Sequence, residues 1–263
     1  MNYRTYKLIG IAVTLIVAGI GGWKHTHQGD NLWSGLSQQT SWNASNLEGK
    51  TELANAKELI RLDNLAYKVG YSQNLRNPIW VMYTLHNEHP NYSGKRPEVG
   101  FQADDRLPNP VTTEDYRNSG YDRGHMAPSY AIGKVWGPQA QLETFLLSNI
   151  SPQKHDMNDG VWNSIERMEM DDFVKRFGKI KVVCGPIFSN PPKRLKSGVA
   201  VPESFFKAIQ RPDKEVIAFI VPQNPESPKP ETYLASIQQI KELTNIDIFP
   251  DAPNPEKART KIW

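Results

Sequence analysis

Apolar and polar positions alternate along most of the chain, and the spacing of the apolar residues changes between two and about 3.6 residues from segment to segment. Segments rich in aromatic and β-branched residues predict strands at 67–71, 79–85, 120–126, 145–150, 179–187, 204–209 and 215–221. Asn77-Pro78 predicts a turn before the second strand. Helical spacing predicts helices at about 52–65, 159–177 and 232–243. This mixture predicts an α+β fold: a single domain with a central, mainly antiparallel sheet flanked by helices.

The first 22 residues differ from the rest of the chain. Arg4 and Lys7 precede an uncharged apolar run at 8–22, which is the pattern of a signal peptide or of a signal anchor. Residues 23–54 lack a sustained period and predict a flexible linker, which leaves 55–263 as the folded domain. We therefore expect an exported protein, either membrane-anchored with an extracytoplasmic domain or, if the signal is cleaved, secreted or periplasmic.

The charge of the whole chain says little about a partner. The net charge is +3, from 31 basic and 28 acidic residues, and part of that excess lies in the first 50 residues. The single cysteine, Cys184, excludes an internal disulfide framework and multi-cysteine metal sites, and its apolar surroundings favour a buried strand residue over a nucleophile. His86 and His89 have no third ligand at a usual spacing, so solvated histidines are favoured over a metal pair.

The stretch Arg123-Gly124-His125 is the strongest candidate for chemistry. Histidine accepts a proton from water near neutral pH, and arginine binds a phosphate or a structural carboxylate with two parallel hydrogen bonds. Glycine between them lets another part of the backbone approach closely.

A second group follows on the helix predicted at 159–177 and just before it. Asn158, Trp162 and Glu166 are spaced so that they share one broad face of a helix. A neutral amide oxygen suits Mg²⁺, which keeps most of its waters, although Asn158 also fits a helix N-cap. Glu166 by spacing alone is equally well explained as an exposed helix carboxylate.

Together these stretches resemble the DNA/RNA non-specific endonucleases, the sugar-non-specific nucleases of the ββα-metal (His-Me finger) class. The resemblance covers roughly residues 67–250. In chain order, its motifs are Asp122-Arg123-Gly124-His125, Pro152-Gln153, Asn158, Trp162, Glu166, Cys184-Gly185-Pro186 and Val201-Pro202.

The resemblance implies a ββα-metal finger at the active site and a phosphodiesterase that depends on Mg²⁺, with Mn²⁺ as a substitute. In it His125 is the general base that activates water, Asn158 binds the metal and Glu166 is a catalytic residue close to the metal and its waters. Arg123 is implied as a catalytic and phosphate-binding residue, and Arg106 as a second substrate-binding residue. DNA and RNA are the implied substrates, the products carry 5′ phosphates, and a membrane contact through the N-terminus and a homodimer are further expectations.

One departure from the family pattern bears on the activity. Many members have an arginine four residues after the helix glutamate, where this chain has Met170, and Arg167 projects about 100° away from Glu166 on a regular helix. Two other hypotheses therefore remain open: a non-catalytic nucleic-acid-binding protein on the same scaffold, and a hydrolase that its loops restrict to a special phosphodiester.

Overall fold

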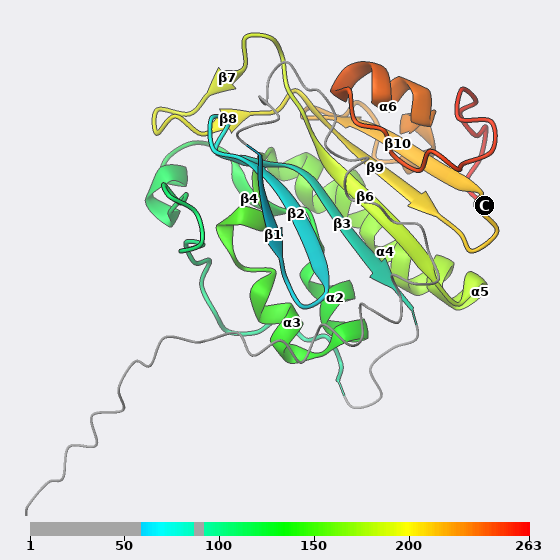
Figure 1. The fold of residues 1–263 in the computed structure, drawn as a ribbon, viewed down its shortest axis with the longest axis horizontal. Helices are drawn as coiled ribbons and strands as arrows, with labels where there is room; N and C mark the ends of the chain where they lie inside the picture. The colour runs from blue at the N-terminus through cyan, green and yellow to red at the C-terminus, as the bar shows by residue number, and fades with distance from the viewer. Residues whose placement is uncertain (1–58, 87–91) are drawn as a thin grey trace, which may run out of the picture. The chain divides into compact units, whose positions relative to one another are not determined.

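A single antiparallel sheet forms the centre of the molecule. The computed structural model describes residues 59–86 and 92–263. Within them seven strands lie in the order β1-β2-β3-β6-β9-β10-β11, and every neighbouring pair is antiparallel (Figure 1). Their bounds are β1 (Leu59–Asp63), β2 (Tyr67–Ser72), β3 (Asn77–Leu85), β6 (Ile180–Ile187), β9 (Ser204–Gln210), β10 (Val216–Pro222) and β11 (Leu234–Ala235). The predicted α+β class and the mainly antiparallel sheet are confirmed.

Helices cover both faces of this sheet, and successive strand residues alternate between two apolar cores. In β3, Val81 and Tyr83 face the first core, whereas Trp80 and Met82 face the second. The first core packs against α2 (Ser129–Trp136), α3 (Pro138–Glu143) and a long helical segment, and the second against α6 (Ile237–Thr244), on the opposite side of the sheet (Figure 1). The long segment consists of η5 (Asp156–Trp162), α4 (Asn163–Met168), η6 (Glu169–Phe173) and α5 (Val174–Phe177).

The long helical segment is irregular. Its backbone is kinked at Gly160, and η5 and η6 are π-helical turns on either side of α4. A π turn holds one more residue than an α turn, so the residues after it are shifted around the helix axis. The segment ends at Gly178, whose φ of 73° is in the left-handed region that glycine adopts without cost.

A separate two-stranded ribbon leads into this helical segment. β4 (Asp122–His125) pairs with β5 (Ile150–Gln153), and Gly124 lies opposite Ser151. A Cβ atom at Gly124 would collide with the side chain of Gln153, so glycine is required where the two strands meet. Because η5 follows β5 directly, the ribbon and the helix form the predicted ββα unit.

The remaining elements are short. β7 (Lys193–Arg194) pairs with β8 (Ala200–Val201), and three single turns complete the set: η3 (Thr113–Tyr116), η4 (Leu147–Asn149) and η7 (Pro230–Tyr233).

Several predicted element boundaries are wrong. Residues 59–63 form an edge strand paired with β2 rather than part of a helix, because pairing along a sheet edge satisfies their backbone groups. Asn77 and Pro78 belong to β3 and not to a turn, whereas residues 147–149 form η4 and the strand begins only at Ile150. The last helix begins at Ile237, after the capping box that Ser236 forms with Gln239.

Other predictions lie outside the described residues. These are the signal segment at 1–22, the linker at 23–54, the start of the domain at 55, the first part of the helix expected at 52–65, and His89. In the described part of the chain, no helix combines the length and the apolar character that crossing a bilayer requires.

Candidate active site

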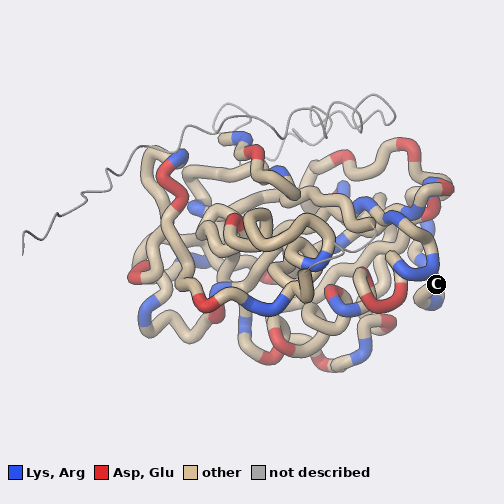
Figure 2. Tube along the Cα trace, turned by 90° about the horizontal axis from the view of Figure 1, so that it is seen from below, with Lys and Arg blue, Asp and Glu red and all other residues tan. Residues whose placement is uncertain are grey.

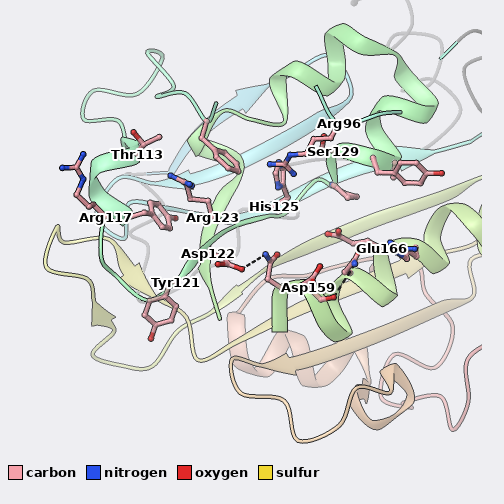
Figure 3. Close-up of a pocket in the computed structure, with 18 of the residues that line it drawn as sticks. Arg96, Thr113, Arg117, Tyr121, Asp122, Arg123, His125, Ser129, Asp159 and Glu166 are labelled. Atoms are coloured by element: carbon pink, nitrogen blue, oxygen red, sulfur yellow. Dashed lines mark hydrogen bonds between the residues drawn. The ribbon is translucent and has the colours of Figure 1, made fainter. Parts of the chain in front are cut away.

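A cleft of about 1020 Å³ opens where β4, the N-terminus of α2 and the long helical segment meet (Figure 3). It takes polar side chains from all three elements and from the loops at 96–101 and 113–121. Residues 123 and 125 are two apart on a strand and therefore project on the same side of β4, into this cleft. The charged and ionisable side chains of the lining are Arg96, Glu114, Tyr116, Arg117, Tyr121, Asp122, Arg123, His125, Tyr130, Asp159, Glu166, Arg167 and Asp171.

His125 lies in the floor of the cleft. Its ring packs edge-on against Phe145, with 5.2 Å between ring centroids, and its Nε2 atom is buried without a hydrogen-bond partner. Its carbonyl oxygen accepts a hydrogen bond from Trp162 Nε1 at 3.3 Å, which ties β4 to the helix. Burial, followed by the positive charge of Arg96, lowers the pKa of His125 to about 3. The imidazole is therefore neutral at ordinary pH and able to accept a proton.

Three guanidinium groups in the cleft lack a carboxylate partner among the described residues: those of Arg96, Arg123 and Arg167. The Arg123 guanidinium lies 5.0 Å from the ring centroid of Phe101, and that of Arg96 lies 4.9 Å from the ring centroid of Phe145. Arginines held over aromatic rings without an acidic partner form a binding surface for anions such as phosphate.

Acidic side chains gather on the opposite wall of the cleft, where Asp122 orients Asn158. One carboxylate oxygen of Asp122 accepts a hydrogen bond from Asn158 Nδ2 at 3.1 Å and lies 2.9 Å from His155 Nδ1. Figure 3 shows Asp122, Asp159 and Glu166 on this wall and Arg96, Arg117 and Arg123 across from it. The cleft thus has a basic and an acidic side with His125 between them.

Glu166 stands above a charged group in the interior. Lys207, on β9, is fully buried and lies 2.8 Å from Glu169 and 3.6 Å from Glu166 Oε1. Its ammonium group also lies 4.5 Å from the ring centroid of Trp162. Burial raises the pKa of Glu166 to about 7, although Lys207 opposes the shift. Glu166 therefore titrates near neutral pH.

The donors on the acidic wall fit a hydrated divalent cation. Asn158 uses its amide nitrogen on Asp122, and its Oδ1 accepts none of the hydrogen bonds formed among the described residues. Glu166 Oε1 is buried 3.6 Å from Lys207 Nζ, and this ion pair holds the carboxylate at the wall of the cleft. In residues 59–86 and 92–263 no group of three or more His, Cys, Asp or Glu side chains could enclose a metal ion. One amide oxygen beside carboxylates matches Mg²⁺, which binds few protein atoms and keeps its waters.

The structure brings together four of the five residues singled out from the sequence: Arg123, His125, Asn158 and Glu166 all line the cleft. Arg106 lies outside it. Its guanidinium donates to both carboxylate oxygens of Asp104 and to the carbonyl of Asp63, so no nitrogen is directed at the cleft.

A regular helix would place Asn158, Trp162 and Glu166 on one face, but the structure does not. Asn158 lies inside the first turn of η5 and is not its N-cap, and Trp162 is buried in the core rather than sharing the cleft face. The π turn η6 directs Met170 into the core and Asp171 into the cleft, while Arg167 reaches the cleft beside Glu166.

Sequence reasoning gave no role to Asp122, although Asp122 begins the motif at 122–125, and it missed Arg96 and Lys207 altogether. Arg96 lies in a loop, where the sequence has no periodic pattern. Lys207 could have been identified from the sequence, because a lysine within an apolar strand is rarely buried without a partner. Over the whole described trace, basic and acidic residues are interspersed and no face is uniformly basic (Figure 2). The anion-binding surface is therefore confined to the cleft.

Comparisons with known proteins agree with this site. The family model described as DNA/RNA non-specific endonuclease matches residues 44–254. The chain is 32% identical over 206 residues to the Xenopus laevis protein named mitochondrial nuclease EXOG, covering 70% of this chain and 56% of that one. It is 29% identical over 207 residues to human mitochondrial endonuclease G, covering 71% and 68%. The chain thus spans little more than half the length of the frog protein.

A solved structure shows the same fold. In the crystal structure of the EndoG/EndoGI complex, a chain that is 23% identical superposes with a TM-score of 0.65, covering 73% of this chain and 86% of that chain.

The expectation of an exported or membrane-anchored, extracytoplasmic protein is wrong. The similar nucleases from frog and human are named as mitochondrial, and so is the Saccharomyces cerevisiae nuclease, which is 28% identical over 220 residues, covering 71% of this chain and 64% of that one.

Proposed function

The chain belongs to the DNA/RNA non-specific endonuclease family, and from this membership and the cleft we propose that it hydrolyses phosphodiester bonds of DNA and RNA with little sequence specificity. The observation that carries the proposal is the placement of a neutral His125 between the two unpaired guanidinium groups of Arg96 and Arg123 and an acidic wall that fits a divalent cation. Phosphate contacts from arginine are independent of base sequence, which agrees with a non-specific nuclease.

In the proposed reaction His125 accepts the proton of the attacking water, because its imidazole is neutral above pH about 3. Arg123 and Arg96 hold non-bridging oxygens of the scissile phosphate on the basic side. Departure of the 3′ oxygen leaves the phosphate on the 5′ end of the next nucleotide, so the products carry 5′ phosphates.

Asn158 Oδ1 would hold the Mg²⁺, with Mn²⁺ as a substitute, and Glu166 would accept hydrogen bonds from the waters of that ion. When bound, such an ion supplies positive charge at the scissile phosphate and at the leaving oxygen. Asp122 fixes the Asn158 amide with its oxygen free for this purpose.

The decisive test compares the full chain with its His125→Ala variant on supercoiled plasmid, each in Mg²⁺ and in EDTA. We expect nicking by the unaltered chain in Mg²⁺ only, and a loss of about 10²- to 10⁴-fold in the variant. Nicking by His125→Ala at the unaltered rate would refute the role of the histidine. Binding without nicking in Mg²⁺ or Mn²⁺ would instead support the non-catalytic hypothesis.

Two other expectations remain predictions. The homodimer is tested by the molar mass of the full chain in solution. Restriction to a special phosphodiester is tested by comparing plasmid, single-stranded DNA, RNA and small diesters as substrates.

A further inference from the structure

A second hollow of about 510 Å³ opens beside the cleft and continues it. The two share Arg96, Ser129 and Tyr130, so these residues stand at the boundary between them. Figure 3 shows Arg96 and Ser129 next to His125. The hollow is completed by Ser93, Gly94, Lys95 and Gln141. It therefore begins at the proposed reaction centre and leads away from it.

The wall of the second hollow is fixed in place. The side chain of Gln141 is buried and its Nε2 donates to the carbonyl of Gly94 at 3.0 Å and to Ser129 Oγ at 3.2 Å. Gly94 has a φ of 70°, and a Cβ there would lie only 2.5 Å from the side chain of Lys134 on α2. The loop is thus held tightly against α2, and the next two residues, Lys95 and Arg96, are presented at the edge of the hollow.

Tyr130 offers an aromatic surface at this boundary. It is the second residue of α2, it lines both hollows, and 45% of it is exposed, so its ring is accessible to a ligand. Lys95 and Arg96 are also exposed, and neither pairs with a carboxylate among the described residues. An exposed ring beside two cations is the arrangement with which proteins hold a nucleotide, because the ring stacks on the base and the cations bind phosphate.

On the basis of the proposed function, we infer that the second hollow binds the nucleotide adjacent to the scissile phosphate, with its base stacked on Tyr130 and its phosphate at Lys95, while Arg96 stands between this phosphate and the scissile one. The distances allow this. Arg96 lies 4.9 Å from the ring centroid of Phe145, which is 5.2 Å from that of His125. Arg96 is therefore within about 10 Å of the imidazole, the sum of these two distances, and it lines both the cleft and the second hollow, so the nucleotide next to the scissile phosphate reaches the hollow.

This assignment makes single-stranded nucleic acid the better substrate. A base in a duplex is already stacked and paired, and moving it onto Tyr130 requires breaking those contacts. A base in a single strand is free to stack, and aromatic stacking does not depend on the identity of the base. The subsite therefore selects strand structure without selecting sequence.

The test compares Tyr130→Ala with Tyr130→Phe in the full chain. The control is Leu142→Ala, which changes a similarly exposed apolar residue (39% against 45% for Tyr130) on α3 outside the hollow. KM is measured in Mg²⁺ on a single-stranded oligonucleotide and on the same sequence as a duplex. We expect Tyr130→Ala to raise KM on the single strand about 5- to 100-fold and on the duplex less than about threefold, because one stacked base is lost. Tyr130→Phe and Leu142→Ala should match the unaltered chain.

An unchanged KM of Tyr130→Ala on the single strand, or an equal rise on both substrates, would overturn the inference and leave the nuclease intact. A binding measurement separates the two proposals: an oligonucleotide that carries 2-aminopurine is titrated with the full chain in EDTA, where stacking on Tyr130 quenches its fluorescence. Quenching that disappears in Tyr130→Ala, from a chain that cleaves nothing in Mg²⁺, would refute the hydrolase and retain the subsite. Quenching that persists in Tyr130→Ala would overturn the subsite alone.

Discussion

Asp122 and Asn158 are joined by a hydrogen bond of 3.1 Å from the amide nitrogen of Asn158 to a carboxylate oxygen of Asp122. The bond connects the first residue of β4 with the first turn of η5, two elements that are 36 residues apart in sequence at this point. An asparagine amide can rotate by half a turn, which exchanges its oxygen and nitrogen. The Asp122 carboxylate can accept a hydrogen bond from the amide nitrogen of Asn158 but not from its amide oxygen. It therefore determines that the oxygen of Asn158 faces the cleft.

Substitution of Asp122 by alanine should weaken metal activation more than it weakens substrate binding. Without the carboxylate the Asn158 amide is free to rotate, and loss of such an orienting partner typically reduces metal affinity 10- to 100-fold. The Mg²⁺ concentration that gives half-maximal cleavage should rise by this factor in Asp122→Ala. Asp171→Ala is the matched control, because Asp171 also lines the cleft but does not bond Asn158. An equal rise in both variants would mean that charge alone, and not orientation, is responsible.

The pH profile of cleavage should follow Glu166 rather than His125. Since the pKa of His125 is lowered to about 3, its base form is already complete well below neutral pH. The pKa of Glu166 is raised to about 7, so its carboxylate forms, and its ability to accept hydrogen bonds from water grows, as the pH rises through 7. At Mg²⁺ concentrations well below saturation, cleavage rates should increase between pH 6 and 8, a window set about one unit either side of that pKa. Saturating Mg²⁺ should move the rise to lower pH, because the positive charge of the ion stabilises the carboxylate.

The variant Glu166→Gln tests the assignment. It should be slower at every pH but lack the rise through neutral pH, because glutamine does not titrate. If the cleavage rate of Glu166→Gln still rises through neutral pH with the same midpoint, a group other than Glu166 is responsible for the rise.

The fold and most of the cleft follow from the sequence because they depend on short-range patterns. Alternation in strands such as 79–85 and the adjacency of Arg123 and His125 on β4 are local properties, and the structure shows both. The spacing at 59–63 predicts a helix where the structure has an edge strand, because the pattern alone does not reveal the partner strand that satisfies the backbone.

The remainder depends on tertiary contacts that no periodicity encodes. The π turn that exchanges Met170 for Asp171 in the cleft breaks the 3.6-residue spacing on which a helical-face prediction rests. Arg96 reaches the cleft because Gln141, some 45 residues later, fixes the loop that precedes it. Arg106 is implied as a phosphate ligand by the family resemblance, but its guanidinium pairs with Asp104 instead.

Breaking the buried ion pair between Lys207 and Glu169 should strongly lower the free energy of unfolding. Both side chains are fully buried, and Tyr83 donates to Glu169 at 2.8 Å. Lys207→Met leaves the Glu169 carboxylate without its cation, which typically lowers the free energy of unfolding by about 3–5 kcal/mol. Urea denaturation at pH 7 measures this loss.

Two variants test whether burial of the charge is the reason that Lys207→Met lowers the free energy of unfolding. Lys214→Met removes a partner of a half-exposed pair with Asp251 and should cost less than about 1 kcal/mol. The double variant Lys207→Met/Glu169→Gln should recover part of the loss, because the neutral amide can still accept from Tyr83. A cost for Lys207→Met no greater than that for Lys214→Met would contradict this explanation.

Arg167 should bind phosphate in place of the arginine that family members carry four residues after the helix glutamate. It is exposed, lines the cleft beside Glu166 and pairs with no carboxylate among the described residues. One phosphate contact fewer reduces the slope of log binding constant against log salt by about one. We expect that reduction for Arg167→Ala, measured with a single-stranded oligonucleotide in EDTA at several salt concentrations.

Lys193→Ala, on the exposed ribbon β7 away from the cleft, removes the same charge and should leave the slope unchanged. Arg167→Lys keeps the charge but loses the planar pair of donors, so it should restore the slope and only part of the affinity. If Arg167→Ala and Lys193→Ala behave alike, net charge explains the binding and Arg167 has no contact with phosphate. If the slope changes only in Arg167→Ala, Arg167 contacts phosphate. The cleft then keeps its helix arginine, at position 167 instead of at the position four residues after Glu166.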